Sequence, residues 1–202
     1  MTHFNIILFD DFETLDAFGP AEMIGCVPDL YSLGYYSLNG GIVESSQKVR
    51  VETLPFSKIA DEQRVLLVPG GGGTRNLVKN HIFLSEIKKM ADKAEHVLSV
   101  CTGAAILATT GLLDGKRATS NKLAFNWVSS CGKGVNWIRR ARWVADGKFY
   151  TSSGVSAGMD MVLGFVRDQN GEEAAQRICS LAEYIWNSDK HDDPFEVYSP
   201  ML

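Results

Sequence analysis

The chain has 202 residues, 45% of them hydrophobic and 22% charged, which is the composition of an ordinary globular protein. Its length predicts a single domain over residues 1–202, and its formal net charge of −4 disfavours a nucleic-acid partner. No apolar run approaches the roughly 20 residues that cross a bilayer, and the N-terminus has no signal-peptide pattern. We therefore expect a cytoplasmic protein with no membrane partner.

The first half of the chain alternates apolar strands with loops and helices. The expected elements are strands at residues 4–9, 31–38 and 64–68, a helix at 14–24 and a partly exposed hairpin at 42–52. The helix is predicted to be interrupted at Gly19-Pro20, because proline is best accepted in the first turn of a helix.

The second half continues the same alternation. Asp146-Gly147 is a strong signal for a two-residue hairpin. The expected elements are a strand at residues 97–100, a hairpin at 142–151 and helices at 83–94, 123–128, 155–167 and 172–186. Apolar strands that each lead into a loop and a helix predict an α/β fold around a mostly parallel sheet.

The four cysteines lie far apart and form neither a Cys-x-x-Cys pair nor a cluster with histidine. This spacing indicates reduced thiols and predicts no disulfide framework and no zinc site. The basic stretch at residues 139–142 is too short to make a nucleic-acid surface, and we interpret it as a solvated loop or strand edge.

Cys101 stands where the strand at 97–100 turns into a helix that begins with Thr102 and Gly103. The N-terminus of a helix and nearby backbone N–H groups favour a thiolate over a thiol, so this position is suited to a nucleophile. The alternative is that Cys101 is one more small buried apolar residue, which is the commonest fate of a free cysteine.

Two other segments end at the same edge of the predicted sheet. Asp16 follows the first strand, where its alternative role is a helix cap or a solvated carboxylate. Residues 70–73 are four consecutive glycines after the strand at 64–68, and such a loop can direct N–H groups at an anion. The loop matches neither dinucleotide nor Walker A motifs, which disfavours nucleotide binding. A carboxylate, a glycine loop and a cysteine on one edge favour a functional site.

Seven short motifs lie along the chain: Leu15-Asp16 with Gly19-Pro20, Val68-Pro69-Gly70-Gly71, Ser99-Val100-Cys101-Thr102-Gly103, the stretch from Gly111 to Thr119, the stretch from Ser152 to Asp160, Glu183-Tyr184 and Asp193-Pro194-Phe195. Together they resemble the ThiJ/PfpI superfamily, whose members are related to class I glutamine amidotransferases, and within it the isocyanide hydratases.

The resemblance implies a flavodoxin-like three-layer sandwich, a homodimer and a nucleophile elbow at Cys101. It also implies that Asp16 hydrogen-bonds the sulfur, and that N–H groups of Gly71, Gly72 and Thr102 surround the reacting centre. The chain departs from the superfamily at two positions.

Protease-like members have histidine directly after the cysteine, where this chain has Thr102. Many relatives have histidine where this chain has Asn121. No motif places His3, His81, His96 or His191 at the thiol, so a Cys-His hydrolase mechanism is disfavoured.

The resemblance implies a hydro-lyase that acts on a small molecule such as an organic isocyanide. In that reaction we expect Cys101 to be the nucleophile and Asp16 to be the proton donor and later the activator of water. The chemistry requires no metal and no organic cofactor. Phe18 and Trp127 are expected as apolar walls of the pocket. Two alternatives stay open: a cysteine redox sensor or stress protein without turnover, and a glyoxalase or amidase-like enzyme that uses the same cysteine.

Overall fold

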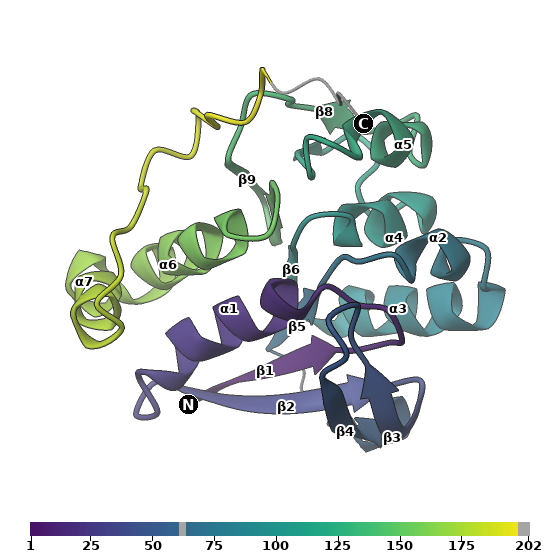
Figure 1. The fold of residues 1–202 in the computed structure, drawn as a ribbon, viewed down its shortest axis with the longest axis horizontal. Coiled ribbons are helices and arrows are strands. Elements are labelled where there is room, and N and C mark those ends of the chain that lie inside the picture. The colour runs from purple at the N-terminus through teal and green to yellow at the C-terminus, as the bar shows by residue number, and fades with distance from the viewer. Residues whose placement is uncertain (61–63, 198–202) are drawn as a thin grey trace.

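The structure is a computed structural model that describes residues 1–60 and 64–197, and within these residues the chain forms one eight-stranded sheet and one small two-stranded pair. The strand order in the large sheet is β3-β4-β2-β1-β5-β6-β10-β9 (Figure 1). Its strands are β1 (Thr2–Ile7), β2 (Tyr31–Ser37), β3 (Asn39–Glu44), β4 (Arg50–Pro55), β5 (Val65–Val68), β6 (His96–Ser99), β9 (Trp143–Asp146) and β10 (Phe149–Ser152). The small pair joins β7 (Arg117–Ala118) to β8 (Asn136–Trp137).

The centre of the sheet is parallel. Strands β2, β1, β5, β6 and β10 run in the same direction, whereas β3 and β9 at the two edges pair antiparallel with their neighbours. The order β2-β1-β5-β6-β10 is the 2-1-3-4-5 order of flavodoxin-like sheets. The expected α/β fold is thereby confirmed, and ligands of such sheets bind beyond the strand ends next to the point where the order reverses, between β1 and β5.

Two groups of helices cover the two faces of the sheet (Figure 1). Helices α1 (Thr14–Gly25), α6 (Ala157–Asn170) and α7 (Glu172–Leu181) pack together on one face. The other group contains α2 (Thr74–Leu77), α3 (His81–Lys93), α4 (Gly103–Thr109) and α5 (Phe125–Ser130), with a short 3-10 helix at Phe56–Lys58.

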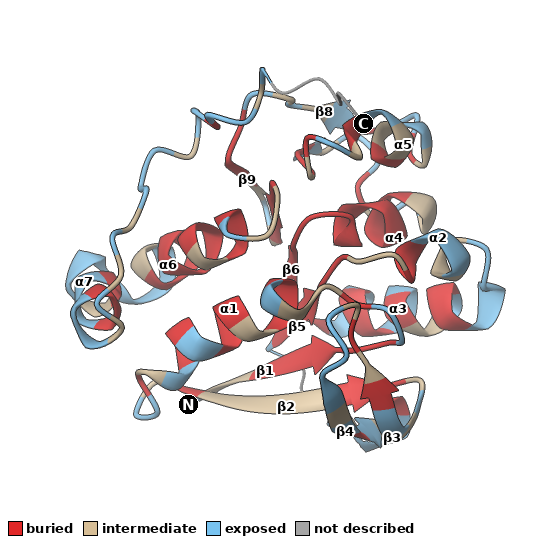
Figure 2. Cartoon of the chain, viewed as in Figure 1, coloured by how far each residue is buried: buried red, intermediate tan, exposed pale blue. Residues whose placement is uncertain are grey.

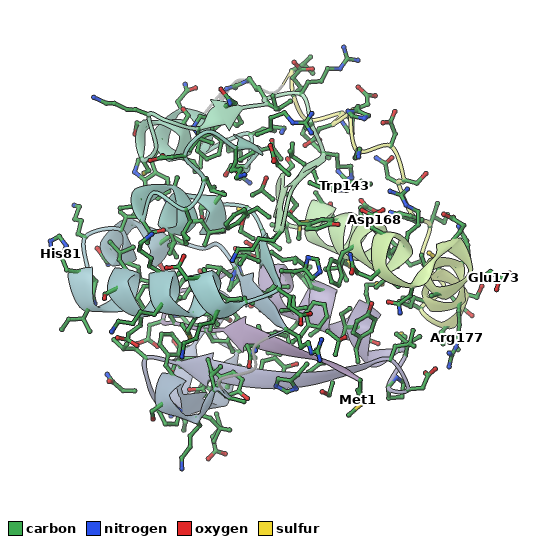
Figure 3. The ribbon with its side chains drawn as sticks, turned by 180° about the vertical axis from the view of Figure 1, so that it is seen from behind. Met1, His81, Trp143, Asp168, Glu173 and Arg177 are labelled. Atoms are coloured by element: carbon green, nitrogen blue, oxygen red, sulfur yellow. The ribbon has the colours of Figure 1, made fainter. Side chains whose placement is uncertain are left out.

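The core lies between these layers. All four residues of β5 are fully buried, which explains why that strand is a continuous apolar run. Figure 2 shows the buried residues concentrated in the central strands and on the sheet-facing sides of α1, α4 and α6. Trp143 of β9 packs against α6 at one end of the core (Figure 3). A Cβ added to Gly164 of α6 would lie 3.0 Å from its indole ring.

Helix α1 corrects one expectation, because it continues through Pro20 without interruption. Packing against α6 holds it in place: a Cβ at Gly19 would lie 2.9 Å from the Met159 side chain, and the ring of Pro20 lies close to Gly158. This tertiary contact offsets the hydrogen bond that proline cannot donate to the carbonyl of Asp16. As a result, Asp16 belongs to the first turn of a continuous helix.

The chain after α7 crosses the molecule from α7 toward β9, and we call residues 182–197 the C-terminal strap (yellow in Figure 1). The basic stretch at residues 139–142 is solvated only in part: Arg140 is exposed, whereas Arg142 is buried and its Nε donates a 2.6 Å hydrogen bond to Asp160 Oδ2 of α6. Among the described residues, no helix has the length and apolar character needed to span a membrane.

Candidate active site

Cys101 occupies the turn between β6 and α4, at the carboxyl end of a central strand. Its φ of 55° lies in the left-handed region, which a non-glycine residue adopts only when its surroundings hold it there. The Cys101 N–H donates to the Ser153 carbonyl at 3.0 Å, and the Cys101 carbonyl accepts from the Ser120 hydroxyl at 2.7 Å. These bonds fix the sharp strand-to-helix turn that was expected of a nucleophile elbow.

Asp16 lies in the first turn of α1 and is completely buried. Its Oδ2 accepts a hydrogen bond from the Gly70 N–H at 2.9 Å. Its Oδ1 is buried as well and has no hydrogen-bond partner among the described residues. The Asp16 carboxyl and the Cys101 thiol lie close enough that each shifts the pKa of the other. The structure therefore brings together the two side chains that were expected to meet.

Burial governs the protonation of both groups. It raises the pKa of Asp16 from 3.8 to about 7, against the lowering effect of the Gly70 N–H. Burial and the neighbouring Asp16 also raise the pKa of the Cys101 thiol, while the N–H and hydroxyl of Thr102 lower it. The sequence predicted a thiolate favoured by the helix, whereas in the folded chain burial outweighs that effect.

Residues 70–73 are glycines because neighbouring segments of the chain lie too close to this loop to leave room for side chains. A Cβ at Gly70 would lie 2.6 Å from Thr102 N, and a Cβ at Gly73 would lie 2.2 Å from the Asp10 carbonyl. Gly71 has a φ of +126°, which strongly favours glycine. The loop is thus wedged between the segment that follows β1 and the start of α4, and this contact aligns Asp16 with Cys101.

The N–H groups of the glycine loop differ in what they bind. Gly71 N–H donates to the Thr102 hydroxyl at 3.0 Å, which in turn lies 3.2 Å from the Thr74 hydroxyl. The N–H of Gly71 is therefore engaged inside the protein, contrary to the expectation that it faces the reacting centre. The Gly72 N–H has no acceptor among the described residues, so it is the N–H of the loop that is available to a substrate.

A pocket of about 390 Å³ lies directly over the thiol. Its walls include Cys101, Thr102, Gly71 and Gly72, as predicted. Asp16 is absent from the walls and lies behind Cys101. Residues that the sequence analysis did not assign to the site also line it, namely Glu13, Arg75, Asn121, Leu123, Ala124 and Val155.

Some of these residues had a signal in the sequence. Glu13 directly precedes the helix of Asp16, and Asn121 was noted where many relatives have histidine. Two expected wall residues lie elsewhere: Phe18 packs against Phe12 and Tyr35, and the Trp127 ring supports Arg75 at 4.7 Å, behind the pocket wall. No histidine is among the described residues that line this pocket.

Relatives of known function are enzymes and regulators. An isonitrile hydratase of Pseudomonas putida is 29% identical over 196 residues, which cover 96% of this chain and 81% of that protein. A deglycase of Thermococcus kodakarensis is 28% identical over 149 residues, which cover 73% of this chain and 87% of the deglycase. The transcriptional regulator GbdR of Pseudomonas aeruginosa is 27% identical over 166 residues, which cover 81% of this chain and 44% of the regulator.

Solved structures agree with the fold. A ThiJ/PfpI family protein from Pseudomonas syringae superposes with a TM-score of 0.83 at 25% identity, over 98% of this chain and 79% of the other. Drosophila melanogaster DJ-1beta superposes with a TM-score of 0.77 at 19% identity, over 92% of this chain and 99% of the other. The sequence of residues 4–168, which includes Asp16, the glycine loop and Cys101, matches the DJ-1/PfpI family. The chain therefore belongs to the DJ-1/PfpI family, as its motifs indicated.

Proposed function

We propose that this chain is a cysteine-dependent hydratase that adds water to an organic isocyanide, R–NC, and releases the N-substituted formamide, R–NH–CHO. The similarity to an isonitrile hydratase over 96% of the chain supports the proposal. The observation that carries it is the position of the buried Asp16 carboxyl beside the Cys101 thiol: Oδ2 accepts from the Gly70 N–H, whereas Oδ1 has no N–H or O–H donor among the described residues. This oxygen can accept and return a proton without breaking an existing hydrogen bond.

In the first step, the ionised Asp16 carboxylate takes the proton of the Cys101 thiol while the sulfur attacks the terminal carbon of R–NC. This assignment follows from the raised pKa of Asp16, about 7, and the raised pKa of the thiol. The protonated Asp16 then gives its proton to the same carbon. The result is a thioimidate, R–N=CH–S–Cys101, and an ionised Asp16.

In the second step, water adds its oxygen to the thioimidate carbon, and its proton passes through Asp16 to the nitrogen. The adduct R–NH–CH(OH)–S–Cys101 then collapses: the hydroxyl proton moves through Asp16 to the sulfur, the C=O bond forms and the C–S bond breaks. One isocyanide and one water become one formamide, and the thiol and the carboxylate are restored. No metal or organic cofactor is needed for these steps.

The test is the hydration of phenyl isocyanide by purified wild type, Cys101→Ala and Cys131→Ala, with formamide measured by chromatography. Cys131 is a matched control because it is also a free cysteine and does not line the pocket. We expect saturable turnover in wild type and Cys131→Ala, and a loss of about 10³-fold or more in Cys101→Ala. Absence of turnover in wild type, or equal turnover in Cys101→Ala, would refute the hydratase proposal.

The similarity to a deglycase supports a second candidate, in which Cys101 attacks a carbonyl carbon such as that of methylglyoxal. The same three proteins distinguish it, because a deglycase or glyoxalase consumes methylglyoxal and leaves phenyl isocyanide unchanged. If neither substrate is consumed, peroxide titration of Cys101 followed by mass spectrometry tests the redox-sensor alternative.

A further inference from the structure

A second cavity of about 400 Å³ adjoins the pocket over Cys101. Asn121, Leu123 and Val155 line both spaces. These three residues therefore form a wall that the reaction pocket and the second cavity have in common. Gly154 widens this boundary, because a Cβ there would lie 3.1 Å from the Asn121 side-chain nitrogen. A molecule bonded to the Cys101 sulfur can therefore extend into the second cavity along this shared wall.

Lys122 lines the second cavity, yet its charge is engaged elsewhere. Its Nζ donates to the Ala141 carbonyl at 2.7 Å and to the Thr119 hydroxyl at 3.1 Å, and it lies 3.5 Å from Asp193 Oδ2. Lys122 and Asp193 are both buried. The ammonium group is thus engaged by acceptors within the protein and is not available to bind an anion in the cavity.

Arg142 also lines the cavity, and its guanidinium is paired in the same way. Its Nε donates to Asp160 Oδ2 at 2.6 Å, and its Nη1 lies 3.8 Å from Asp193 Oδ1. The two cations of the wall are therefore matched by two buried carboxylates. The rest of the described wall includes the apolar side chains of Leu123, Val155 and Phe195 together with the polar residues Asn121, Ser153 and Ser156.

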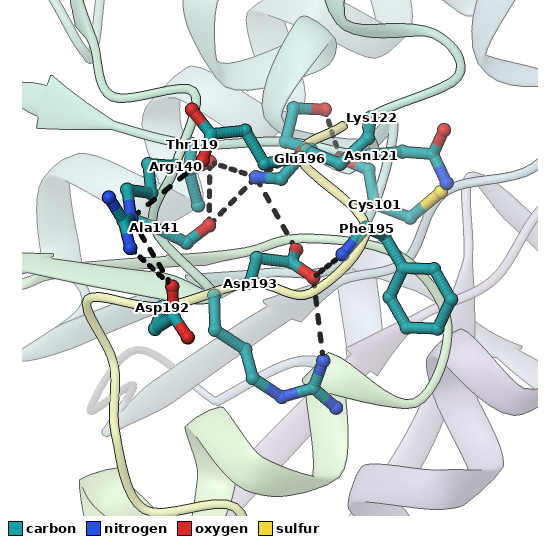
Figure 4. A network of polar contacts seen from close by, with 12 residues as sticks. Cys101, Thr119, Asn121, Lys122, Arg140, Ala141, Asp192, Asp193, Phe195 and Glu196 are labelled. Atoms are coloured by element: carbon teal, nitrogen blue, oxygen red, sulfur yellow. Dashed lines mark hydrogen bonds and ion pairs between the residues drawn. The ribbon is translucent and has the colours of Figure 1, made fainter. Parts of the chain in front are cut away.

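Phe195 comes from the C-terminal strap, and the buried ion pairs fix its position (Figure 4). Asp193 N–H donates to the Arg140 carbonyl at 2.9 Å, and Phe195 N–H donates to Asp193 Oδ1 at 3.1 Å. Asp193 thereby ties the strap to Lys122 and Arg142 and sets the ring of Phe195 at the cavity wall. About half of the Phe195 side chain is exposed, so its replacement leaves the core intact.

We propose that this second cavity binds the substituent R of the isocyanide, that it takes bulky apolar groups such as cyclohexyl or naphthyl, and that Phe195 determines this specificity. This inference rests on the proposed hydratase function. A volume of about 400 Å³ lies within the range of small-molecule sites and holds a ring system of that size. When the apolar substituent packs against Phe195, its surface is removed from water. This removal is the main source of binding free energy for such a group.

The kinetic test compares cyclohexyl isocyanide with methyl isocyanide in wild type, Phe195→Ala and Val197→Ala. Val197 is the matched control because it is an exposed apolar residue on the same strap that does not line the cavity. We expect the ratio of kcat/KM for the large over the small isocyanide to fall about tenfold in Phe195→Ala, through a higher KM for the large one. The ratio in Val197→Ala is expected to stay within about twofold of wild type. Equal ratios in wild type and Phe195→Ala, with turnover present, would overturn the inference and leave the hydratase proposal standing.

A second measurement does not depend on hydratase activity. Cys101 is alkylated with iodoacetamide and with its N-cyclohexyl derivative, and the modified Cys101 peptide is quantified by mass spectrometry. In wild type we expect the cyclohexyl reagent to be favoured relative to its reactivity with a free thiol. This preference is expected to fall in Phe195→Ala and to persist in Val197→Ala. The absence of any preference in wild type would contradict the apolar site even if no isocyanide is turned over.

Discussion

The environment of the Asp16 side chain differs strongly from that of a free carboxyl in water. It is a fully buried carboxyl with one hydrogen-bonded oxygen and one oxygen without a partner among the described residues. Burial raises its pKa to about 7, which places its titration in the physiological range. Both its chemistry and its effect on stability follow from this shift.

The first prediction concerns the pH dependence of the reaction. Because the ionised form of Asp16 takes the thiol proton, kcat/KM for phenyl isocyanide is expected to rise as the pH increases through about 7. Asp16→Asn should lose about 10²- to 10⁴-fold in kcat and should lack this rise. Glu22→Gln, an exposed acid on the same helix, serves as the control. A wild-type profile that falls with increasing pH through this range would contradict the role of Asp16 as a base.

The second prediction concerns stability. Between the unfolded pKa of 3.8 and the folded pKa of about 7, the unfolded chain releases the Asp16 proton while the folded chain keeps it. The free energy of unfolding therefore decreases as the pH rises through this window, by about 4 kcal/mol at most. Asn at position 16 does not titrate, so the free energy of unfolding of Asp16→Asn should lack this decrease. From pH 5 to pH 8, urea unfolding should show the free energy of unfolding of the variant, relative to that of wild type, increasing by about 3 kcal/mol. A difference that does not change with pH would show that Asp16 does not titrate in this range.

At the scale of elements, the C-terminal strap and the glycine loop both place functional groups through buried contacts. The strap brings Asp193 into contact with Lys122 and Arg142, and the loop at residues 70–73 fits between the segment after β1 and the start of α4. Neither contact is visible in local sequence patterns, because the partners lie tens of residues apart. The motif Asp193-Pro194-Phe195 contributes to the family resemblance, but the local sequence does not indicate that it anchors the strap.

The third prediction compares two neighbouring aspartates of the strap. Asp193→Ala removes the partner of buried cations, and such a change costs about 3–5 kcal/mol because a buried charge loses its counter-charge. Asp192→Ala removes an exposed pair with Arg140 and is expected to cost less than about 1 kcal/mol. Urea unfolding of the two variants at pH 7 measures the difference. Equal stabilities would mean that Asp193 does not anchor the strap.

At the scale of the whole molecule, the chain leaves several large apolar side chains exposed, among them Ile42, Leu54, Leu123, Leu181 and Ile185. A homodimer would bury part of this exposed apolar surface. The resemblance of the motifs to the superfamily implies a homodimer, and we propose that the protein forms one.

The fourth prediction follows from that proposal. Sedimentation equilibrium at micromolar concentration should give twice the chain mass of 22.2 kDa. The mass should stay constant over a tenfold range of concentration if the interface is stable. A mass of one chain throughout that range would contradict the dimer and would leave the active-site proposals unaffected, because Asp16 and Cys101 come from the same chain.

The sequence by itself determined the fold class, most of the strands and helices along the chain, and the common edge of the sheet at which Asp16, the glycine loop and Cys101 lie. It could do so because burial within a parallel sheet requires continuous apolar runs, and because the carboxyl ends of such strands lie on one edge. It did not indicate α2, β8 or the short 3-10 helix. The motifs also indicated the family, and the match over residues 4–168 confirms that membership.

The tertiary structure alone decided the rest. Helix α1 passes through Pro20 because α6 supports it, and Arg142 is buried because Asp160 neutralises it. The raised pKa values at Asp16 and Cys101, the engagement of the Gly71 N–H and the cavity walls at Asn121 and Phe195 depend on neighbours distant in sequence. Local patterns report the hydrophobicity and backbone preference of a segment, whereas burial, charge pairing and cavity shape arise only when distant segments pack together.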